Sequence, residues 1–220
     1  TLIGGVNDEI YYVDDEGDVV IEKGEGDGES LDRVEAASNY VIPDRVEDLT
    51  LTALGTRGVG NALDNKLTGV GESTLIGLDG DDTYFMPSSS TAIEASGGGF
   101  DVLNFVEDIN EDGSMKTSGL YRLSDYANFE GLGVQRVLHA TIIGNDIGNK
   151  LSAISEQVVI QGGGGNDSIY CLSARGGEID GGNGDDYIES RLHPGSLGGG
   201  GLPKGLISGG AGDDTIRVYQ

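Results

Sequence analysis

Three nine-residue segments in the last third of the chain repeat one pattern: Gly162-Gly163-Gly164-Gly165-Asn166-Asp167-Ser168-Ile169-Tyr170, Gly181-Gly182-Asn183-Gly184-Asp185-Asp186-Tyr187-Ile188-Glu189 and Gly209-Gly210-Ala211-Gly212-Asp213-Asp214-Thr215-Ile216-Arg217. Each reads Gly-Gly-x-Gly-x-Asp-x-U-x, where U is apolar. A fourth copy at 77–85 lacks only the second glycine, and a fifth at 3–10 has lost one residue. A fixed short period of this kind is the sequence signature of a repeat architecture.

The repeat frame extends beyond the three full copies. A short strand points alternate side chains inward and outward, and glycine pairs let the backbone reverse, so two such blocks close one turn of about eighteen residues. We therefore predict an all-β fold, a parallel β-roll or β-solenoid with irregular strand-and-loop insertions. The inward column, with one member per half-turn, is expected to contain Leu151, Ile160, Ile169, Ile179, Ile188, Ile207 and Ile216.

The composition excludes some partners and favours another. Thirteen Lys plus Arg against 38 Asp plus Glu give a formal charge of −25 over 220 residues. A surface this acidic repels phosphates and anionic headgroups, so we expect no nucleic-acid partner. No apolar run reaches the ~20 residues of a membrane span. Acidic turns stacked about 4.8 Å apart repel one another, and a bound divalent cation reverses that interaction.

The nonapeptide resembles the RTX, or hemolysin-type calcium-binding, repeat of type I secreted bacterial proteins. This resemblance implies that Ca²⁺ is the cofactor, that the chain works outside the cell or at the cell surface, and that it belongs to a larger parent chain or a protein assembly there. It also implies a chain that stays unfolded for export and folds where calcium is abundant. Carboxylate and carbonyl oxygens are the hard ligands that Ca²⁺ takes.

The candidate calcium ligands follow from their positions in the repeat. The carboxylate in sixth place is the primary candidate, and the residue before it and the turn glycine carbonyls are further candidates. In the three full copies these are Asp167, Asp186 and Asp214, with Asn166, Asp185 and Asp213 before them; in the degenerate copies they are Asp82 and Asp8.

A longer repetition divides the rest of the chain. We predict a first long repeat unit at 1–76, a second at 77–143, and a calcium-binding β-roll at 144–220 with a loop insertion at 190–208. The closing blocks of the two long units carry Asn65 and Asn149 where aspartate stands elsewhere. An amide is a weaker calcium ligand than a carboxylate. These turns are therefore either structural or bound through a neighbouring aspartate.

An insertion near 107–119 contains a second acidic motif. Asp108-Ile109-Asn110-Glu111-Asp112-Gly113 fits the opening of an EF-hand loop. The glutamate expected in twelfth place is Gly119, and no flanking helices are predicted. Two interpretations stay open: a free-standing calcium loop formed by Asp108, Asn110 and Asp112, or an acidic hairpin turn.

Motifs for catalysis are missing from the sequence. It has no H-E-x-x-H zinc motif and no G-x-S-x-G elbow. The two histidines, His139 and His193, are expected at the surface or in turns, and the single cysteine, Cys171, is expected to be buried. We therefore predict a non-catalytic, structural calcium-binding segment. Alternatives are an adhesin or matrix module that binds glycan or protein through its inserted loops, or the repeat part of a secreted carbohydrate-active enzyme or protease.

Overall fold

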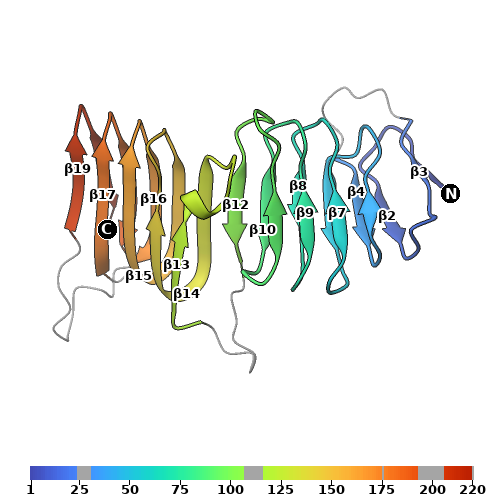
Figure 1. Cartoon of the computed structure of the whole chain (residues 1–220), viewed down its shortest axis with the longest axis horizontal. Helices are drawn as coiled ribbons and strands as arrows, with labels where there is room; N and C mark the ends of the chain where they lie inside the picture. The colour runs from blue at the N-terminus through green and yellow to red at the C-terminus, as the bar shows by residue number, and fades with distance from the viewer. Residues whose placement is uncertain (24–30, 107–115, 175, 193–205, 220) are drawn as a thin grey trace. The chain divides into compact units, whose positions relative to one another are not determined.

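The computed structural model describes residues 1–23, 31–106, 116–174, 176–192 and 206–219, and these form a parallel β-solenoid (Figure 1). This confirms the predicted fold class. The one helix among them is a single 3₁₀ turn, Leu123–Asp125. No helix in this part of the chain is long and apolar enough to cross a membrane. The chain divides into two compact units, Thr1–Leu103 and Asn104–Gln220.

In unit 1 the successive turns place strands alternately in two parallel sheets. The first sheet contains β2 (Ile10–Val13), β4 (Arg33–Ala36), β6 (Asp48–Leu51), β8 (Lys66–Thr68) and β10 (Thr83–Met86). The second sheet contains β5 (Tyr40–Val41), β7 (Arg57–Val59), β9 (Thr74–Ile76) and β11 (Thr91–Ile93). Strands β1 (Leu2–Ile3) and β3 (Val20–Ile21) form a separate two-stranded sheet. Strand β12 (Val102–Phe105) lies at the boundary between the units.

The core of unit 1 consists of side chains stacked in register. Alternate residues of each strand point inward, as the two-residue period of a strand requires. Parallel pairing aligns these inward residues from turn to turn, so that each lies above its equivalent in the previous turn. The resulting column of the first sheet is at most 5% exposed and contains Tyr11, Val34, Leu49, Leu67 and Tyr84.

Unit 2 has longer strands with the same parallel pairing. Strand β15 pairs with β16 through its first part and with β17 through its second, because one long strand passes from one side of the solenoid to the other. The strands are β13 (Ser118–Arg122), β14 (Gly131–Ile143), β15 (Lys150–Gly164), β16 (Ser168–Ala174), β17 (Gly176–Asn183), β18 (Tyr187–Leu192), β19 (Leu206–Ala211) and β20 (Thr215–Tyr219).

The predicted column of aliphatic residues is present in unit 2 as two stacks, one for each half-turn. Leu151, Ile169 and Ile188 are in register on one side, and Ile160 and Ile179 are in register on the other. All five are at most 3% exposed. Ile216 continues the first stack but is 43% exposed, because it belongs to the last turn that the structure describes.

Several sequence predictions concern residues other than these aliphatic stacks. Cys171 is buried, as expected, and His139 is exposed on β14. Asp108, Asn110 and Asp112 of the EF-hand-like motif lie outside the described residues, as do His193 and most of the 190–208 insertion. The division after Leu103 separates the two compact units, whereas the predicted boundaries after 76 and 143 separate sequence repeats. Those repeat boundaries stay predictions.

Candidate metal centre

The sixth-position carboxylates of unit 2 form a hydrogen-bonded column. The backbone N–H of Asn149 donates to Asp167 Oδ1 at 2.7 Å, that of Asp167 to Asp186 Oδ1 at 2.8 Å, and that of Asp186 to Asp214 Oδ1 at 3.0 Å. Each carboxylate thus binds the turn before it in the sequence. Asp167 and Asp186 are 1% and 2% exposed. Three of the primary candidate ligands therefore lie together.

The second oxygen of these carboxylates faces a glycine. Oδ2 of Asp167 and Oδ2 of Asp186 are buried and have no hydrogen-bond partner among the described residues. A Cβ atom at Gly162 would overlap Asp167 Oδ2 and also the carbonyl oxygen of Gly181, so only glycine fits there. Carboxylate and carbonyl oxygens that converge in this way are the donor set of a hard divalent cation.

The backbone at the second place of each nonapeptide has a positive φ, which favours glycine there. Gly163, Gly182 and Gly210 have φ values of 109°, 107° and 102°, which side chains rarely adopt. Leu78 holds this place in the degenerate copy and still has a φ of 91°. The turn geometry is therefore kept there at the cost of backbone strain.

The residues before these carboxylates form an outer column at the surface. Asn166 Oδ1 accepts the backbone N–H of Asp185 at 2.9 Å, and Asp185 Oδ1 accepts that of Asp213 at 2.9 Å. All three residues are exposed. They therefore cap successive turns with one oxygen each, and their proposed part in calcium binding stays a prediction.

Burial makes the inner column electrostatically costly. Burial, followed by the charge of Asp186, raises the pKa of Asp167 to about 6. Burial also raises the pKa of Asp186, and the charges of Asp214, Asp180 and Asp185 add to the effect. A raised carboxyl pKa means that the neutral form is favoured in the fold. A cation near these oxygens would favour the charged form instead.

Unit 1 contains a buried cluster around Asp82, a candidate ligand from the sequence, whose other members, Glu94 and Asp101, were not predicted. Oxygens of Asp82, Glu94 and Asp101 lie within 4.8 Å of one another, and the three residues are 0%, 7% and 0% exposed. The backbone N–H of Asp82 donates to Asp101 Oδ1 at 2.9 Å, and the Tyr84 hydroxyl donates to the Glu94 carboxylate. The backbone N–H of Asn65 donates to Asp82 Oδ1 at 2.7 Å.

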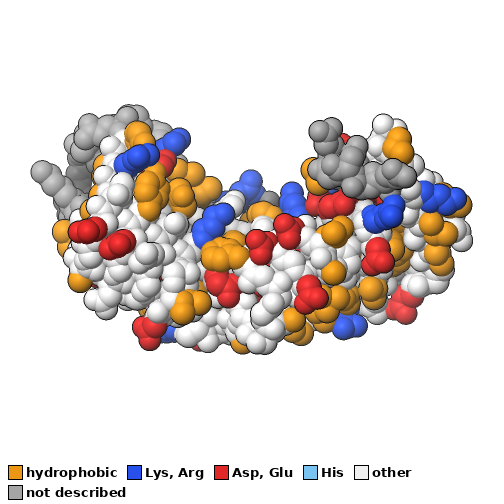
Figure 2. Space-filling view, turned by 90° about the horizontal axis from the view of Figure 1, so that it is seen from above, with side chains coloured by type: hydrophobic (Ala, Val, Ile, Leu, Met, Phe, Trp, Pro, Cys, Tyr) orange, Lys and Arg blue, Asp and Glu red, His pale blue; other side chains and the backbone are white. Residues whose placement is uncertain are grey.

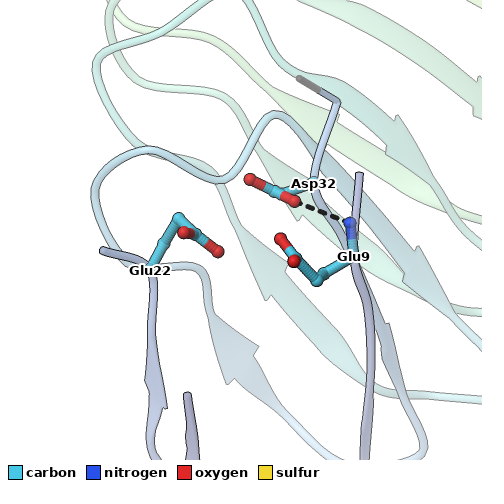
Figure 3. Close-up of side chains that lie close together, drawn as sticks. All are labelled: Glu9, Glu22 and Asp32. Atoms are coloured by element: carbon cyan, nitrogen blue, oxygen red, sulfur yellow. Dashed lines mark hydrogen bonds between the residues drawn. The ribbon is translucent and has the colours of Figure 1, made fainter. Parts of the chain in front are cut away.

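A matching cluster lies earlier in the same unit (Figure 3). Oxygens of Glu9, Glu22 and Asp32 also lie within 4.8 Å of one another, and the three carboxylates point from separate segments toward a common space. The backbone N–H of Glu9 donates to Asp32 Oδ1 at 2.8 Å, and the Tyr11 hydroxyl donates to Glu22. Burial, with the charges of Glu22 and Glu9, raises the pKa of Asp32 to about 6.

The predicted ligand of this turn, Asp8, lies elsewhere. Its side chain is exposed and accepts the backbone N–H of Leu31 at 3.0 Å. Glu9 occupies the inner position instead, because it stands in sixth place counted from Gly4, as Asp82 does counted from Gly77, whereas Asp8 stands in fifth place. The expectation that this copy has lost a residue was therefore wrong. The repeated Ile21-Glu22 and Ile93-Glu94 pairs are the sequence signal that could have identified the two clusters.

Asn65 and Asn149 use their amide groups within the turns. Asn65 Oδ1 accepts the N–H of Asn61 at 2.8 Å, and its Nδ2 donates to the carbonyl oxygen of Glu47 at 3.2 Å. Asn149 Oδ1 likewise accepts the N–H of Asn145 at 2.9 Å. A carboxylate could not make the donated bond. The amides are therefore suited to these positions as structural groups.

On the face shown in Figure 2 the acidic side chains lie singly or in small groups between uncharged side chains and backbone. Among the described residues, the groups of three carboxylates whose oxygens lie within 4.8 Å of one another are the two clusters of unit 1.

Comparison with known proteins adds no assignment: no family model matches the chain, and the searches of curated proteins and of solved structures gave no significant match.

Proposed function

We propose that this chain is a calcium-binding, non-catalytic β-roll of the RTX type, which folds on calcium and has a structural role in a larger secreted or cell-surface protein. One observation carries the proposal: the column of buried sixth-position carboxylates in unit 2, in which Asp167 and Asp186 each keep one oxygen without a hydrogen-bond partner. The residues that would hold the ions are Asp167, Asp186 and Asp214, together with glycine carbonyls such as that of Gly181.

The donor set fits calcium by its chemistry. It consists of oxygen atoms only, from carboxylates and backbone carbonyls, and Ca²⁺ takes six to eight such ligands. Oxygen ligands alone do not favour zinc or copper, which prefer sulfur and imidazole ligands. A bound divalent cation supplies positive charge where adjacent turns bring carboxylates together.

Coupling of calcium to folding follows from this electrostatics. Each turn adds a buried carboxylate to the column, and a carboxylate buried without compensation is strongly unfavourable. The apolar core is only a few residues wide in each turn. Residues Asp167 and Asp186 therefore oppose closure of their turns when charged and uncompensated, and favour it when a cation is bound, so binding energy becomes folding energy.

The test is far-UV circular dichroism of EDTA-treated protein during calcium titration. We compare the wild type with a triple variant, Asp167→Asn, Asp186→Asn and Asp214→Asn, which keeps the shape and the accepted hydrogen bonds but removes three charges. The matched control, Asp125→Asn with Glu156→Gln and Glu178→Gln, removes three exposed charges from the same unit.

We expect calcium to increase the β-sheet signal of the wild type and the control cooperatively. The triple variant should need at least tenfold more calcium for the same change, because its column has lost its anionic ligands. A full β-sheet signal in EDTA, with no response to calcium in any of the proteins, would overturn the proposal.

A further inference from the structure

We propose that unit 1 contains two cation sites of a second kind, each built from three carboxylates and a tyrosine. One consists of Asp82, Glu94 and Asp101 with Tyr84, and the other of Glu9, Glu22 and Asp32 with Tyr11. The first is buried inside the solenoid, whereas Glu9 and Glu22 of the second are half-buried. This inference does not depend on the calcium column of unit 2, because the residues and the supporting contacts are different.

A buried oxygen of Asp82 is the first observation that points to a ligand. Asp82 is 0% exposed, and its Oδ2 has no hydrogen-bond partner among the described residues. This oxygen is directed into the cluster: a Cβ atom at Gly77 would overlap Asp82 Oδ2, Glu94 Oε1 and the Tyr84 hydroxyl together. A buried carboxylate oxygen of this kind requires a compensating proton or cation.

The charges around Asp82 do not supply that compensation. The charged groups that act on it most strongly are Glu94, Asp101 and Asp64, and all three are acidic. The structure therefore concentrates negative charge at one buried point. Three carboxylates at this separation repel one another far more than they would in water. A bound cation removes both the repulsion and the burial penalty.

Parallel register explains how each glutamate comes to lie inside the turn. Ile76 pairs with Ile93, so Glu94 lies opposite Gly77; Ile3 pairs with Ile21, so Glu22 lies opposite Gly4. The corresponding place in unit 2 is taken by glycine in four turns, at positions 144, 162, 181 and 209. Glu22 and Glu94 thus occupy a place that has no side chain in those four turns.

The same arrangement occurs twice, with Glu9 in the place of Asp82. In each cluster a glycine leaves space for the glutamate of the next turn. A Cβ atom at Gly4 would overlap Tyr11 and Glu22. A Cβ atom at Gly77 would likewise overlap Tyr84 and Glu94. Oε2 of Glu9 repeats the buried oxygen without a hydrogen-bond partner. Such agreement between two separate turns indicates a built site rather than an accidental meeting of acidic side chains.

The tyrosines act as positioning residues. Tyr84 is in register with Leu67, and so takes the place of an aliphatic core residue. Its ring fills the core while its hydroxyl donates to Glu94, which fixes that carboxylate and leaves other oxygens of the cluster for an ion. Tyr11 has the same relation to Glu22.

The expected ligand class is a hard cation of calcium size. All donors are oxygens, and their separations of up to 4.8 Å match two ligands on opposite sides of an ion at about 2.4 Å each. A lanthanide such as Tb³⁺ has the same preference for oxygen. Tyrosine transfers excitation energy to a nearby Tb³⁺, and the chain has no tryptophan to compete, so Tyr11 and Tyr84 are built-in reporters.

The experiment uses the whole chain and measures Ca²⁺ stoichiometry by equilibrium dialysis and Tb³⁺ luminescence excited through tyrosine. Glu94→Gln should remove one bound ion and reduce the sensitised emission, and Glu22→Gln with Glu94→Gln should remove two ions. Glu72→Gln, an exposed change in the same unit, should remove none. Tyr84→Phe should keep the ion count and lose emission, whereas Tyr187→Phe, on a strand of unit 2, controls for other tyrosines.

Unchanged stoichiometry and affinity in Glu94→Gln would overturn this inference. If the Asp167, Asp186 and Asp214 variant loses ions while Glu94→Gln loses none, only the interior sites are refuted. The reverse result would refute the column and retain the clusters. Should Glu94→Gln fail to fold, crystals of the wild type grown with Tb³⁺ decide the matter: anomalous peaks between the three carboxylates support the sites, and peaks only elsewhere refute them.

Discussion

At the scale of single residues, the two oxygens of each inner carboxylate have different tasks. Oδ1 of Asp82 and of Asp167 accepts a backbone N–H from the preceding turn, which contributes about 1 kcal/mol and fixes the side chain. Oδ2 lies against a glycine without a hydrogen bond. The first oxygen builds the solenoid, and the second is the one that a cation would bind.

The glycines of the turns give a first prediction. Gly182→Ala should lower the free energy of unfolding by about 3 kcal/mol or more, because its φ of 107° is unfavourable for alanine and the new Cβ would collide with the carbonyl oxygen of Gly163. Gly97→Ala is the control: its φ is 78° but no atom lies within 4 Å. It should cost only about 1 kcal/mol. Urea denaturation with calcium present measures both, and equal losses would refute this account.

The pKa of Asp82 gives a second prediction. Burial, then the charges of Glu94, Asp101 and Asp64, raises this pKa from the usual 3.8 to about 8. The folded state therefore holds a proton that the unfolded state releases, so in EDTA the equilibrium should shift from the folded toward the unfolded state as pH rises from about 4 to about 8. Asp82→Asn should weaken this shift, above all at pH values above about 6, since it removes one titrating group and keeps the acceptor for the Asn65 N–H.

The β-sheet signal in far-UV circular dichroism, measured at a series of pH values in EDTA, checks this shift. Tyr84 also faces the cluster, but its raised pKa keeps it neutral throughout this range. A stability that is independent of pH, or that rises with pH toward 8, would contradict the assignment of Asp82 as a buried group with a raised pKa.

At the scale of strands and turns, the same backbone N–H to carboxylate hydrogen bond links successive turns although the turns differ in length. Column residues linked by these bonds are separated by 17 residues between Asn65 and Asp82, 19 between Asp82 and Asp101, and 28 between Asp186 and Asp214. Extra residues are accommodated in loops, while the parallel register of the strands is kept. The strand pairing therefore fixes the column more strictly than the nine-residue period does.

The asparagine turns give a third prediction. Asn65→Asp should destabilise the protein by about 2 kcal/mol, because a carboxylate cannot donate the bonds that Nδ2 makes to the carbonyl oxygens of Val46 and Glu47. It would also add charge next to Asp82. Glu72→Gln, at an exposed position of the same unit, is the control and should have little effect. Thermal unfolding measures both, and a stabilised Asn65→Asp protein in calcium would instead make this turn a cation site.

At the scale of the whole molecule, the two units use related columns with different partners. In unit 2 the carboxylates lie against glycine carbonyls. In unit 1 each cluster also contains a glutamate that lies opposite a glycine of the previous turn, and a tyrosine from the core. Because repeats in a solenoid contact mainly their neighbours, ions bound in one unit stabilise mostly their own turns.

Hydrogen exchange gives a fourth prediction. Calcium should slow amide exchange in β16, β18 and β20 of unit 2 and in β8 to β11 of unit 1, because each protected strand adjoins a carboxylate column or cluster. The Asp167, Asp186 and Asp214 variant should lose protection in unit 2 alone, and Glu94→Gln in unit 1 alone. Mass spectrometry of peptides after exchange measures this, and uniform loss in both variants would contradict local stabilisation.

The amino-acid sequence by itself determined the parallel solenoid and the inward aliphatic stacks such as Ile169 and Ile188. These follow from short-range rules: strand alternation, glycine conformation and a fixed period. The tertiary structure alone decided that Glu22 and Glu94 face inward and meet aspartates from other turns. The physical reason is register, since parallel pairing brings together cluster residues that are 7 to 23 positions apart, and the loops between them hide that relation in the sequence.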